Sequence, residues 1–281
     1  MINLQGIDLS EHNGDKVDDF IINSGFVMIR TGYGSKNRTK QEDKEVYNNV
    51  RKCIKYGKPF GFYHYSYATT EKLAEDEADF CLSIVDKVSN QGHRPLYPVA
   101  FDIEDKKLDK LTIAERTDIC IAFCNKIEKS GYYAVIYASR EYFRHKLDLK
   151  RLERFDKWVA DWTKTTNETL NKTVPCGMRQ YTVDRTNNLD KNIAFKDYPV
   201  IIKKMYDSRG KKTQTTKTLK VGSVVRVLKP IIYGTNKKFI QYYDCYEVLQ
   251  IGKILKNRIV IGRGKTITTA VDRKNLEVIR Q

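Results

Sequence analysis

Short apolar segments of strand length alternate with longer amphipathic segments over roughly the first two hundred residues of the chain. Apolar and polar positions alternate with a period of two in the short segments and recur at helical spacing in the longer ones. Repeated strand and helix units of this kind predict an α/β fold with a parallel sheet, and about eight strands favour a closed, TIM-like (β/α) barrel. The later units are short of helices, which predicts an irregular barrel. The expected strands are 6–10, 26–30, 60–67, 98–105, 133–138, 157–161, 178–182 and 189–193.

Two of the amphipathic segments carry clear signals for where a helix begins or ends. The segment 40–56 keeps its apolar residues on one face, and Gly57 follows where a left-handed residue commonly ends a helix. The segment 70–88 also has an apolar face, and Thr70 is a suitable N-cap. We therefore expect one helix over each segment.

Six cysteines occur in the chain, and none shows the CxxC spacing of common zinc sites. Cys120 and Cys124 continue the apolar stripe of a third expected helix, 112–130. We therefore expect buried thiols, with no metal site and no disulfide framework.

The composition changes after about residue 203, where basic residues, threonines and a serine replace the apolar pattern. We interpret 207–217 as a basic linker that follows a first domain over 1–206. Alternating apolar and polar residues then return, which predicts a small all-β barrel over 218–281. Its expected strands are 221–227, 242–250, 253–255 and 258–262, with a hairpin turn at Lys256 and Asn257.

The chain carries a formal net charge of +16, from 51 lysines and arginines against 35 acidic residues. This excess predicts association with a polyanion, with an affinity that falls as the salt concentration rises. The sequence shows no zinc-finger, helix-turn-helix or ribonucleoprotein signature, so we do not expect nucleic acid as a partner. The anionic polymers of a bacterial wall are a polyanion of another kind, and a solvated charged surface with an ordinary role in solubility is the alternative.

The first residues, 1–5, have no basic start, apolar run or small-residue cleavage site. We therefore expect no signal peptide and no membrane insertion. The expected place of synthesis is a cytoplasm.

The fourth expected strand is the strongest candidate for chemistry. Its face with Val99, Phe101 and Ile103 is apolar, and its other face carries Asp102 and Glu104. Two neighbouring carboxyls repel each other when both are ionised, which favours holding one proton near neutral pH, as a general acid must. A solvated acidic turn is the alternative, and this strand alone does not separate the two readings.

Other carboxylates fall at expected strand ends as well, namely Asp8 and Asp190. Active sites of (β/α) barrels gather at the carboxyl ends of the strands. The sequence therefore predicts that these acids converge with Asp102 and Glu104 in one pocket.

Several ordered motifs carry a family resemblance. Their order and spacing resemble the glycoside hydrolase family 25 lysozymes, over about residues 1–205, and such a set is far more specific than any single motif. The resemblance implies an irregular eight-stranded barrel, hydrolysis of the bond between N-acetylmuramic acid and N-acetylglucosamine in bacterial peptidoglycan, and no cofactor. The motifs are Gly6-Ile7-Asp8-Leu9-Ser10, Phe62-Tyr63-His64-Tyr65, Phe101-Asp102-Ile103-Glu104, Trp158-Val159-Ala160-Asp161, Gln180-Tyr181 and Asp190-Lys191-Asn192.

The resemblance assigns roles to the acids by position. Glu104 would be the general acid and Asp102 its acidic partner, with Asp8 and Asp190 as supporting carboxylates. The loop before Asp190 lacks the family's usual glycine-rich run, so Asp184 is its rival.

The resemblance also implies which residues meet the sugar. Tyr63, Tyr137 and Trp158 match aromatic residues that line the groove, and Gln180 lies in a strand that contributes to its floor. For Tyr63 and Trp158, a place in the barrel core is the alternative. Arg30, at the end of the second expected strand, either pairs with a pocket carboxylate or contacts substrate, and we favour the ion pair.

Two further residues of these motifs have a simpler reading. The alternation places His64 opposite Tyr63 and Tyr65, so we expect it to pack outside the barrel. We expect Asp161 to face solvent.

The stereochemistry of the cleavage stays open from spacing alone. Residues two apart on a strand are about 6.6 Å apart, between the separations typical of retaining and inverting enzymes. The resemblance favours a retaining route in which the substrate's own N-acetyl carbonyl attacks the anomeric carbon and Asp102 stabilises the cation.

The tail arrangement looks like the SH3-like wall-binding modules that end many endolysins, so we expect a phage endolysin that acts at the bacterial wall. Two other functions are considered. A barrel that binds glycan without cutting it is the first. A peptidoglycan amidase or endopeptidase with a Cys-His pair is the second, although no cysteine lies at a helix start beside a plausible base.

Overall fold

The computed structural model describes residues 2–213, 219–243 and 245–280. The chain divides into two compact units, Met1–Asp207 and Ser208–Gln281. Each unit has its own sheet and its own apolar core.

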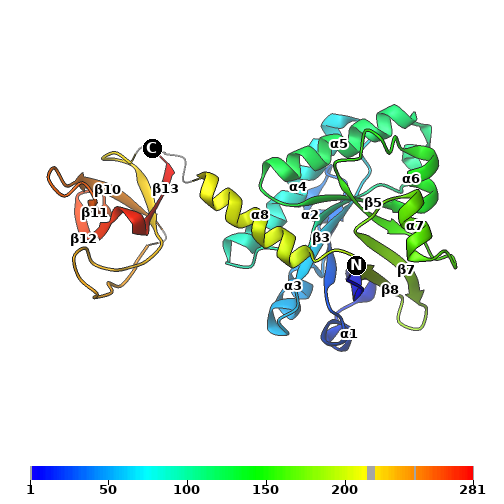
Figure 1. The fold of residues 1–281 in the computed structure, drawn as a ribbon, viewed down its shortest axis with the longest axis horizontal. Helices are drawn as coiled ribbons and strands as arrows, with labels where there is room; N and C mark the ends of the chain where they lie inside the picture. The colour runs from blue at the N-terminus through cyan, green and yellow to red at the C-terminus, as the bar shows by residue number, and fades with distance from the viewer. Residues whose placement is uncertain (1, 214–218, 244, 281) are drawn as a thin grey trace. The chain divides into compact units, whose positions relative to one another are not determined.

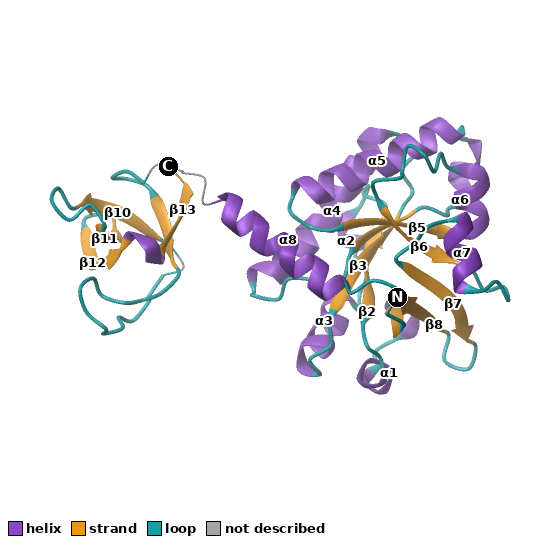
Figure 2. Cartoon of the chain, in the orientation of Figure 1, coloured by secondary structure: helices purple, strands orange, loops and turns teal. Residues whose placement is uncertain are grey.

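The first unit is a closed barrel of eight strands, joined in sequence order from β1 to β8 (Figures 1 and 2). Strands β1 to β7 run parallel to one another, whereas β8 is antiparallel to both of its neighbours, β7 and β1. The predicted irregular barrel is confirmed, but the expectation of a wholly parallel sheet is wrong at β8. Only the short turn 185–188 joins β7 to β8, and a parallel connection needs a crossover of a dozen or more residues. The strands are β1 (Leu4–Leu9), β2 (Val27–Tyr33), β3 (Phe60–Tyr65), β4 (Val99–Asp102), β5 (Ala134–Ser139), β6 (Asp156–Ala160), β7 (Met178–Asp184) and β8 (Leu189–Ala194).

Helices cover the outside of the strands (Figure 2). Thr70 caps its helix as predicted, since its hydroxyl accepts a hydrogen bond from the Leu73 backbone N–H at 3.2 Å, and Gly57 has a left-handed φ of 64°. The single helix expected over 40–56 is instead two, α2 and α3. The chain between them bends toward β2, where the Asp43 N–H donates to the Thr31 carbonyl at 3.1 Å. The helices are α1 (Asp18–Asn23), α2 (Arg38–Gln41), α3 (Val46–Lys55), α4 (Glu71–Asn90), α5 (Ile113–Lys129), α6 (Arg140–Lys146), α7 (Asn167–Thr173) and α8 (Tyr198–Thr213).

The period-two pattern of β4 separates two apolar layers. Val99, Phe101 and Ile103 are fully buried between the strands and the outer helices. Ala100 belongs to a second cluster inside the barrel, and Asp102 shares its face. The strand therefore points its carboxylate into the barrel, toward the end where β4 stops.

The predicted thiols on α5 are buried, as expected. Cys120 and Cys124 are both fully inaccessible and belong to the outer apolar layer. Burial raises the pKa of both thiols, which keeps them protonated. No helix in the described parts of the chain is long and apolar enough to cross a membrane.

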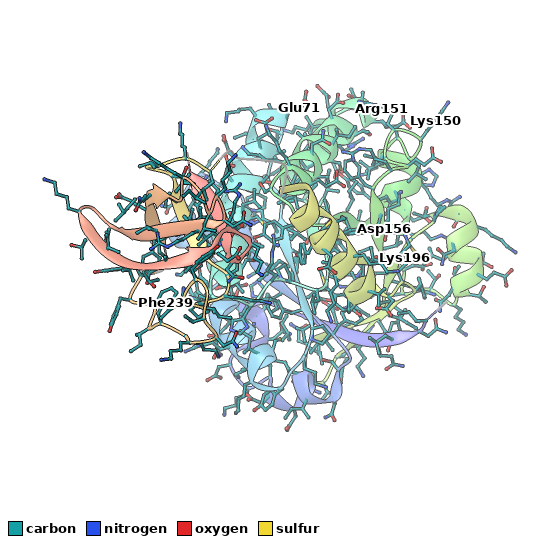
Figure 3. The ribbon with its side chains drawn as sticks, turned by 60° about the vertical axis from the view of Figure 1, so that its left-hand side comes forward. Glu71, Lys150, Arg151, Asp156, Lys196 and Phe239 are labelled. Atoms are coloured by element: carbon teal, nitrogen blue, oxygen red, sulfur yellow. The ribbon has the colours of Figure 1, made fainter. Side chains whose placement is uncertain are left out.

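The start of α8 is tied to the barrel through Asp156. Its carboxylate lies 3.0 Å from the Lys196 ammonium and accepts a hydrogen bond from the Tyr198 hydroxyl at 2.8 Å (Figure 3). The helix then continues to Thr213, so 207–213 of the expected linker is helical. The rest of that expectation, 214–217, lies outside the described residues.

The second unit contains a five-stranded antiparallel sheet in the order β12, β11, β10, β9, β13. The expected strand 253–255 is wrong, because these residues belong to the loop between β10 and β11. Gly252 and Arg258 close this loop with a backbone hydrogen bond of 2.9 Å, and the loop includes the expected turn residues Lys256 and Asn257. The strands are β9 (Val224–Val227), β10 (Tyr246–Ile251), β11 (Arg258–Arg263), β12 (Thr266–Asp272) and β13 (Leu276–Arg280).

Candidate active site

A pocket of about 280 Å³ opens at the carboxyl ends of the parallel barrel strands. All nine residues singled out in the sequence line it, together with further polar residues that include Ser10, His12 and Asn13. The nine are Asp8, Arg30, Tyr63, Asp102, Glu104, Tyr137, Trp158, Gln180 and Asp190.

Three separate strands bring the four acids together. Asp8 lies near the end of β1, Asp102 ends β4, and Glu104 follows two residues later. Asp190 lies near the start of β8 and is directly opposite Asp8 in the β1 and β8 register. Because β8 runs antiparallel, its beginning and the ends of the other strands share one side of the barrel.

Asp8 is the most hydrogen-bonded of these acids. Its Oδ2 accepts from the side-chain amides of Asn192 at 2.7 Å and Gln180 at 3.1 Å. Burial and the neighbouring charge of Asp190 nevertheless raise its pKa from 3.8 to about 7, since they outweigh the two hydrogen bonds. Asp8 is thus close to half-protonated near neutral pH.

Asp102 is also buried, but its carboxyl group has less hydrogen bonding than that of Asp8 to offset the cost of burial. Only 4% of the residue is exposed, and its Oδ1 has no hydrogen-bond partner among the described residues. Burial, followed by the charges of Glu104 and Asp8, raises its pKa well above the ordinary value, and the positive charge of Arg30 opposes this only in part. A buried oxygen without a hydrogen bond leaves the negative charge of the ionised form poorly compensated, in agreement with the raised pKa.

Glu104 is an exposed residue whose side chain contributes to the wall of the pocket. Partial burial of its carboxyl group, then the charges of Asp190 and Asp105, raise its pKa. Asp105 is held beside it, where its Oδ2 accepts a hydrogen bond from the Tyr65 hydroxyl at 3.2 Å. Glu104 therefore combines a raised pKa with access to solvent, as proton transfer to a substrate requires.

Polar links between aromatic and amide side chains form the base of the pocket. The Trp158 indole N–H donates to Asn192 Oδ1 at 2.7 Å, and the Tyr137 hydroxyl donates to Gln180 Oε1 at 3.0 Å. Tyr63 packs edge-on against Trp158 with ring centroids 5.9 Å apart. Burial raises the pKa of the Tyr63 and Tyr137 hydroxyls well above 10, so both remain proton donors.

Arg30 forms the expected ion pair, but with acids outside the group of four. Its guanidinium contacts Asp43 at 2.7 Å and Glu11 at 3.0 Å. The pairs hold the cation at the side of the pocket, where its charge lowers the pKa of Asp102 relative to burial alone. The prediction of a pocket carboxylate as the partner is wrong.

Two other residues of the motifs differ in outcome. His64 is fully buried outside the barrel, against Phe80 and Phe123, as predicted. Asp161 is only 4% exposed, so the expectation that it faces solvent is wrong. Its carboxylate is needed inside the protein, where Oδ1 accepts from the Thr163 backbone and hydroxyl.

Asp184, the rival of Asp190, lies away from the pocket walls. Its carboxylate accepts hydrogen bonds from Thr186 and Asn187 in the turn after β7, and these lower its pKa. A turn carboxylate with local donors has a structural purpose of its own. The sequence suggested no role for Asn192, nor for the pocket residues His12, Asn13 and Asn188. The position of Asn192, two after Asp190 on a strand, places both on one face and could have indicated it.

Among the described residues, no group of three or more histidine, cysteine, aspartate or glutamate side chains has a geometry that could hold a metal ion. Asp8 is hydrogen-bonded by two side-chain amides, and Asp102 feels the charges of Glu104, Asp8 and Arg30.

The comparisons with known proteins agree with this geometry. The family model for glycosyl hydrolases family 25 matches residues 7–190. A comparison with curated protein sequences gives no match.

Three solved structures illustrate the shared fold. The CTP1L endolysin has a TM-score of 0.57 and 23% identity, over 72% of this chain and 70% of its own. The catalytic domain of endolysin ply40 from bacteriophage P40 of Listeria monocytogenes has a TM-score of 0.55 and 22% identity, over 72% of this chain and 98% of its own. The modular autolysin LytC from Streptococcus pneumoniae, solved with a synthetic peptidoglycan ligand, has a TM-score of 0.54 and 24% identity over 68% of this chain.

The chain spans about half the length of that modular autolysin, 46%, so the likeness concerns the barrel. At identities of 22 to 24%, these structures show that the fold is shared and nothing beyond it. The family model covers more than half of the sequence and includes all four acids of the pocket. The chain therefore belongs to glycosyl hydrolase family 25.

Proposed function

We propose that the protein is a peptidoglycan hydrolase of the lysozyme type, an N-acetylmuramidase that cleaves the β-1,4 bond between N-acetylmuramic acid and N-acetylglucosamine. The observation that carries this proposal is the pocket itself, in which four carboxyl groups lie above an aromatic base. Glycoside hydrolysis needs a proton for the leaving oxygen and a negative charge beside an oxocarbenium-like sugar. Acids in unequal environments supply both.

Glu104 is the proposed general acid. Its pKa is raised, and its position at the exposed side of the pocket suits transfer of a proton to a glycosidic oxygen. Asp102 is the proposed acidic partner, because it lines the same pocket beside Glu104 and its charge can stabilise the developing positive charge or orient the substrate's N-acetyl group. Asp8 and Asp190 are proposed to support this arrangement by holding charge and protons nearby.

Replacement of the proposed acid is the direct test. We expect Glu104→Gln to lower the release of reducing ends from purified peptidoglycan by about 10² to 10⁴, because the proton-transfer contribution is lost. Glu71→Gln, the same change at an exposed position in the first turn of α4, is the matched control and should retain full activity. Full turnover by a folded Glu104→Gln protein would remove Glu104 from the mechanism.

The products separate this function from the two alternatives. New reducing ends on N-acetylmuramic acid identify a muramidase, whereas new amino groups identify an amidase or endopeptidase. A Cys-His mechanism is poorly supported, since five of the six cysteines are buried and Cys81 and Cys176 have pKa values raised to about 12. Binding without any product would leave a glycan-binding barrel.

The stereochemical part of the proposal is retention through the substrate's N-acetyl group. Substrate assistance needs a carboxyl group beside that amide, and Asp102 is the acid that offers an unpaired oxygen. Proton NMR of freshly released fragments should show the β-anomer first. Early appearance of the α-anomer would contradict retention.

The second unit is proposed to be an SH3-like wall-binding module. Tyr242 and Tyr243 are exposed beside a hollow of the surface, and the Arg263 guanidinium lies 4.8 Å above the Tyr243 ring. Such aromatic and cationic surface suits glycan or peptide, and the net charge of +16 suits anionic wall polymers. Sedimentation of the full chain with purified walls tests this, since Tyr242→Ala with Tyr243→Ala should leave more protein unbound.

The biological role that we propose is that of a phage endolysin. Several structural neighbours support this, since CTP1L, Cpl-1 and ply40 are endolysins, whereas LytC is an autolysin of Streptococcus pneumoniae. Expression inside a susceptible bacterium, with and without permeabilisation of the membrane, would test the role. Lysis that follows only permeabilisation is the expected result.

A further inference from the structure

We propose that Trp162 is a sugar-stacking residue that extends the cleft beyond the four acids, and that Arg179 is the positioning residue that fixes it. This inference rests on the proposed function. The chain contains two tryptophans, and they differ in environment. Trp158 is 1% exposed in the barrel, whereas Trp162, just after β6, is 56% exposed.

The exposed indole is attached to the pocket by its N–H. Trp162 Nε1 donates to Gln180 Oε1 at 3.1 Å. The same Gln180 side chain donates from Nε2 to Asp8 and accepts from the Tyr137 hydroxyl. A single amide therefore connects the exposed ring to the base of the pocket and to one of its acids, which fixes the ring at the border of the pocket.

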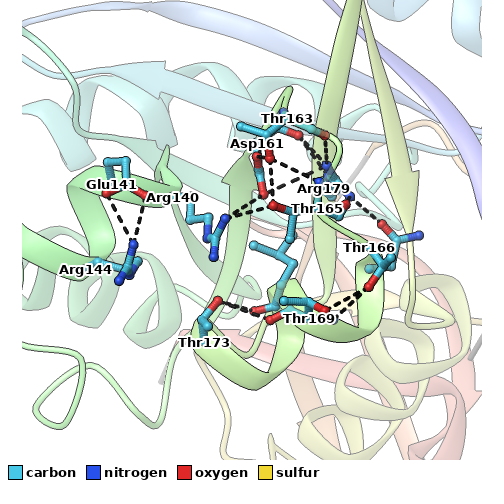
Figure 4. A network of polar contacts seen from close by, with 12 residues as sticks. Arg140, Glu141, Arg144, Asp161, Thr163, Thr165, Thr166, Thr169, Thr173 and Arg179 are labelled. Carbon is cyan, nitrogen blue, oxygen red and sulfur yellow. Dashed lines mark hydrogen bonds and ion pairs between the residues drawn. The ribbon is translucent and has the colours of Figure 1, made fainter.

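Arg179 holds the loop that carries this tryptophan. Its guanidinium makes five hydrogen bonds of 2.7 to 3.0 Å, to the carbonyls of Asp161, Thr163 and Thr165 and to the side chain of Asn167 (Figure 4). These use every N–H of the side chain, which is 6% exposed. The backbone of a surface loop is normally mobile. Here the buried guanidinium of Arg179 fixes the loop at several carbonyls.

Asp161 and Arg140 complete the support of the loop. Asp161 Oδ1 accepts from the Thr163 N–H and hydroxyl, and the Asp161 N–H donates to the Gln180 carbonyl at 3.0 Å. Arg140 donates to the Thr165 hydroxyl at 2.9 Å and lies 3.7 Å from Asp161 Oδ2 (Figure 4). The two residues on either side of Trp162 are thus held, while its ring stays open to solvent.

Neighbouring residues of one strand produce this arrangement. Arg179 and Gln180 point to opposite faces of β7, as consecutive strand residues must. The first holds the loop backbone from outside the barrel, and the second holds the indole from inside it. A role in core packing does not account for Trp162, because its ring is exposed. Nor does it account for the five hydrogen bonds that Arg179 makes to the loop.

A hexosamine ring of the wall glycan is the occupant that we propose for the exposed face. A pyranose presents C–H groups on its faces and hydroxyls at its edges, so it can lie flat on an indole without losing its hydrogen bonds to water. A ring that is fixed before binding loses little conformational entropy when the sugar arrives.

The two environments provide an optical test in the full-length protein. In a Glu104→Gln background, acrylamide should quench Trp162 strongly, and a tetrasaccharide of alternating N-acetylglucosamine and N-acetylmuramic acid should protect it. Trp162→Phe leaves only the buried Trp158, and its weaker quenching should not change with the sugar. Quenching of Trp162 that a saturating tetrasaccharide leaves unaltered would overturn the inference.

Calorimetry and kinetics test the contribution of the ring. Trp162→Ala should weaken binding of the tetrasaccharide about tenfold or more, as for a central aromatic contact, and should raise KM more than it lowers kcat. Trp162→Phe retains a ring without the N–H and should stay within about threefold of the parent, which separates stacking from the bond to Gln180. Equal affinity of the Ala variant and its parent would exclude stacking.

Arg179→Lys tests the positioning role. It keeps the charge but provides three donors in place of five, so Trp162 should gain motion, measured as lower fluorescence anisotropy, and KM should rise severalfold. A melting temperature that falls with no change in anisotropy or KM would indicate a structural role alone.

The outcomes keep this inference separate from the proposed function. If the wild-type protein releases no reducing ends and the Glu104→Gln protein does not bind the tetrasaccharide, the proposed function fails. If the wild-type protein cleaves while Trp162→Ala binds and cleaves normally, only the present inference fails.

Discussion

The burial of Asp8 makes a quantitative prediction about stability and pH. A carboxyl group with a raised pKa in the folded protein keeps its proton at pH values where the unfolded chain has released it. The free energy of unfolding therefore falls as the pH rises from about 4 toward 7. Asp8→Asn keeps the size of the side chain but cannot ionise, so this loss should disappear in the variant.

The magnitude follows from the pKa. Asp8 titrates at about 7 in the folded protein and at 3.8 ordinarily, a difference of about three pH units. Each pH unit corresponds to about 1.36 kcal/mol. The free energy of unfolding of the variant, relative to that of the wild type, should therefore rise by about 4 kcal/mol between pH 4 and pH 8. The substitution also changes the hydrogen bonds from Asn192 and Gln180, but this alters stability by a similar amount at every pH. It therefore largely cancels when the stabilities at pH 4 and pH 8 are compared. Activity should fall as stability rises.

Urea unfolding of both proteins from pH 4 to pH 8 measures the effect. The difference between their unfolding free energies should widen with pH and level off above about pH 7. Asp184→Asn is the control, because hydrogen bonds from its turn lower the pKa of Asp184, so both folded and unfolded chains are ionised there above pH 4 and the difference from the wild type should stay nearly constant across this range. Parallel curves for wild type and Asp8→Asn across this range would refute the reasoning from burial.

Three further predictions concern other buried groups. Asn192→Ala removes a donor to Asp8, so it should lower stability by about 1 to 3 kcal/mol in urea unfolding and shift the pH–activity profile toward higher pH; an unshifted profile would contradict this. Arg30→Met leaves the carboxylate of Asp43 buried without its cation, and calorimetry should show a loss of about 3 kcal/mol, whereas an unchanged melting temperature would exclude a stabilising ion pair. Cys245 is only partly buried, so a thiol reagent should modify it first in the native protein and reach the five other cysteines after denaturation; simultaneous labelling of all six would argue against the fold.

Local patterns were sufficient to predict most of the barrel. The alternation of Val99, Phe101 and Ile103 with Asp102 depends on a period of two, which neighbouring residues alone determine. The Thr70 cap likewise depends on a hydrogen bond within one helical turn. Convergence of Asp8, Asp102 and Glu104 followed from the rule for parallel strands, whereas Asp190 joins them in the pocket because β8 runs antiparallel.

One error of prediction was local: the connection 185–188 between β7 and β8 is too short for a parallel crossover, and the expectation of repeated strand and helix units overlooked this. The other errors depend on contacts between residues in different elements. The burial of Asp161 and the attachment of Trp162 depend on Arg179 and Gln180 in the following strand. From the sequence alone, a short loop with an acid and an aromatic residue is expected to be exposed, because its partners lie in another strand.

The final hairpin of the barrel leaves one border of the pocket free to vary. Asn188, in the turn between β7 and β8, lines the pocket and fixes Asn13 through its carbonyl. Since this turn connects antiparallel neighbours, it could be lengthened or shortened without disturbing a crossover helix or the register of the other strands. A change in the length of this one connection would therefore reshape that border of the pocket, while the acids keep their places.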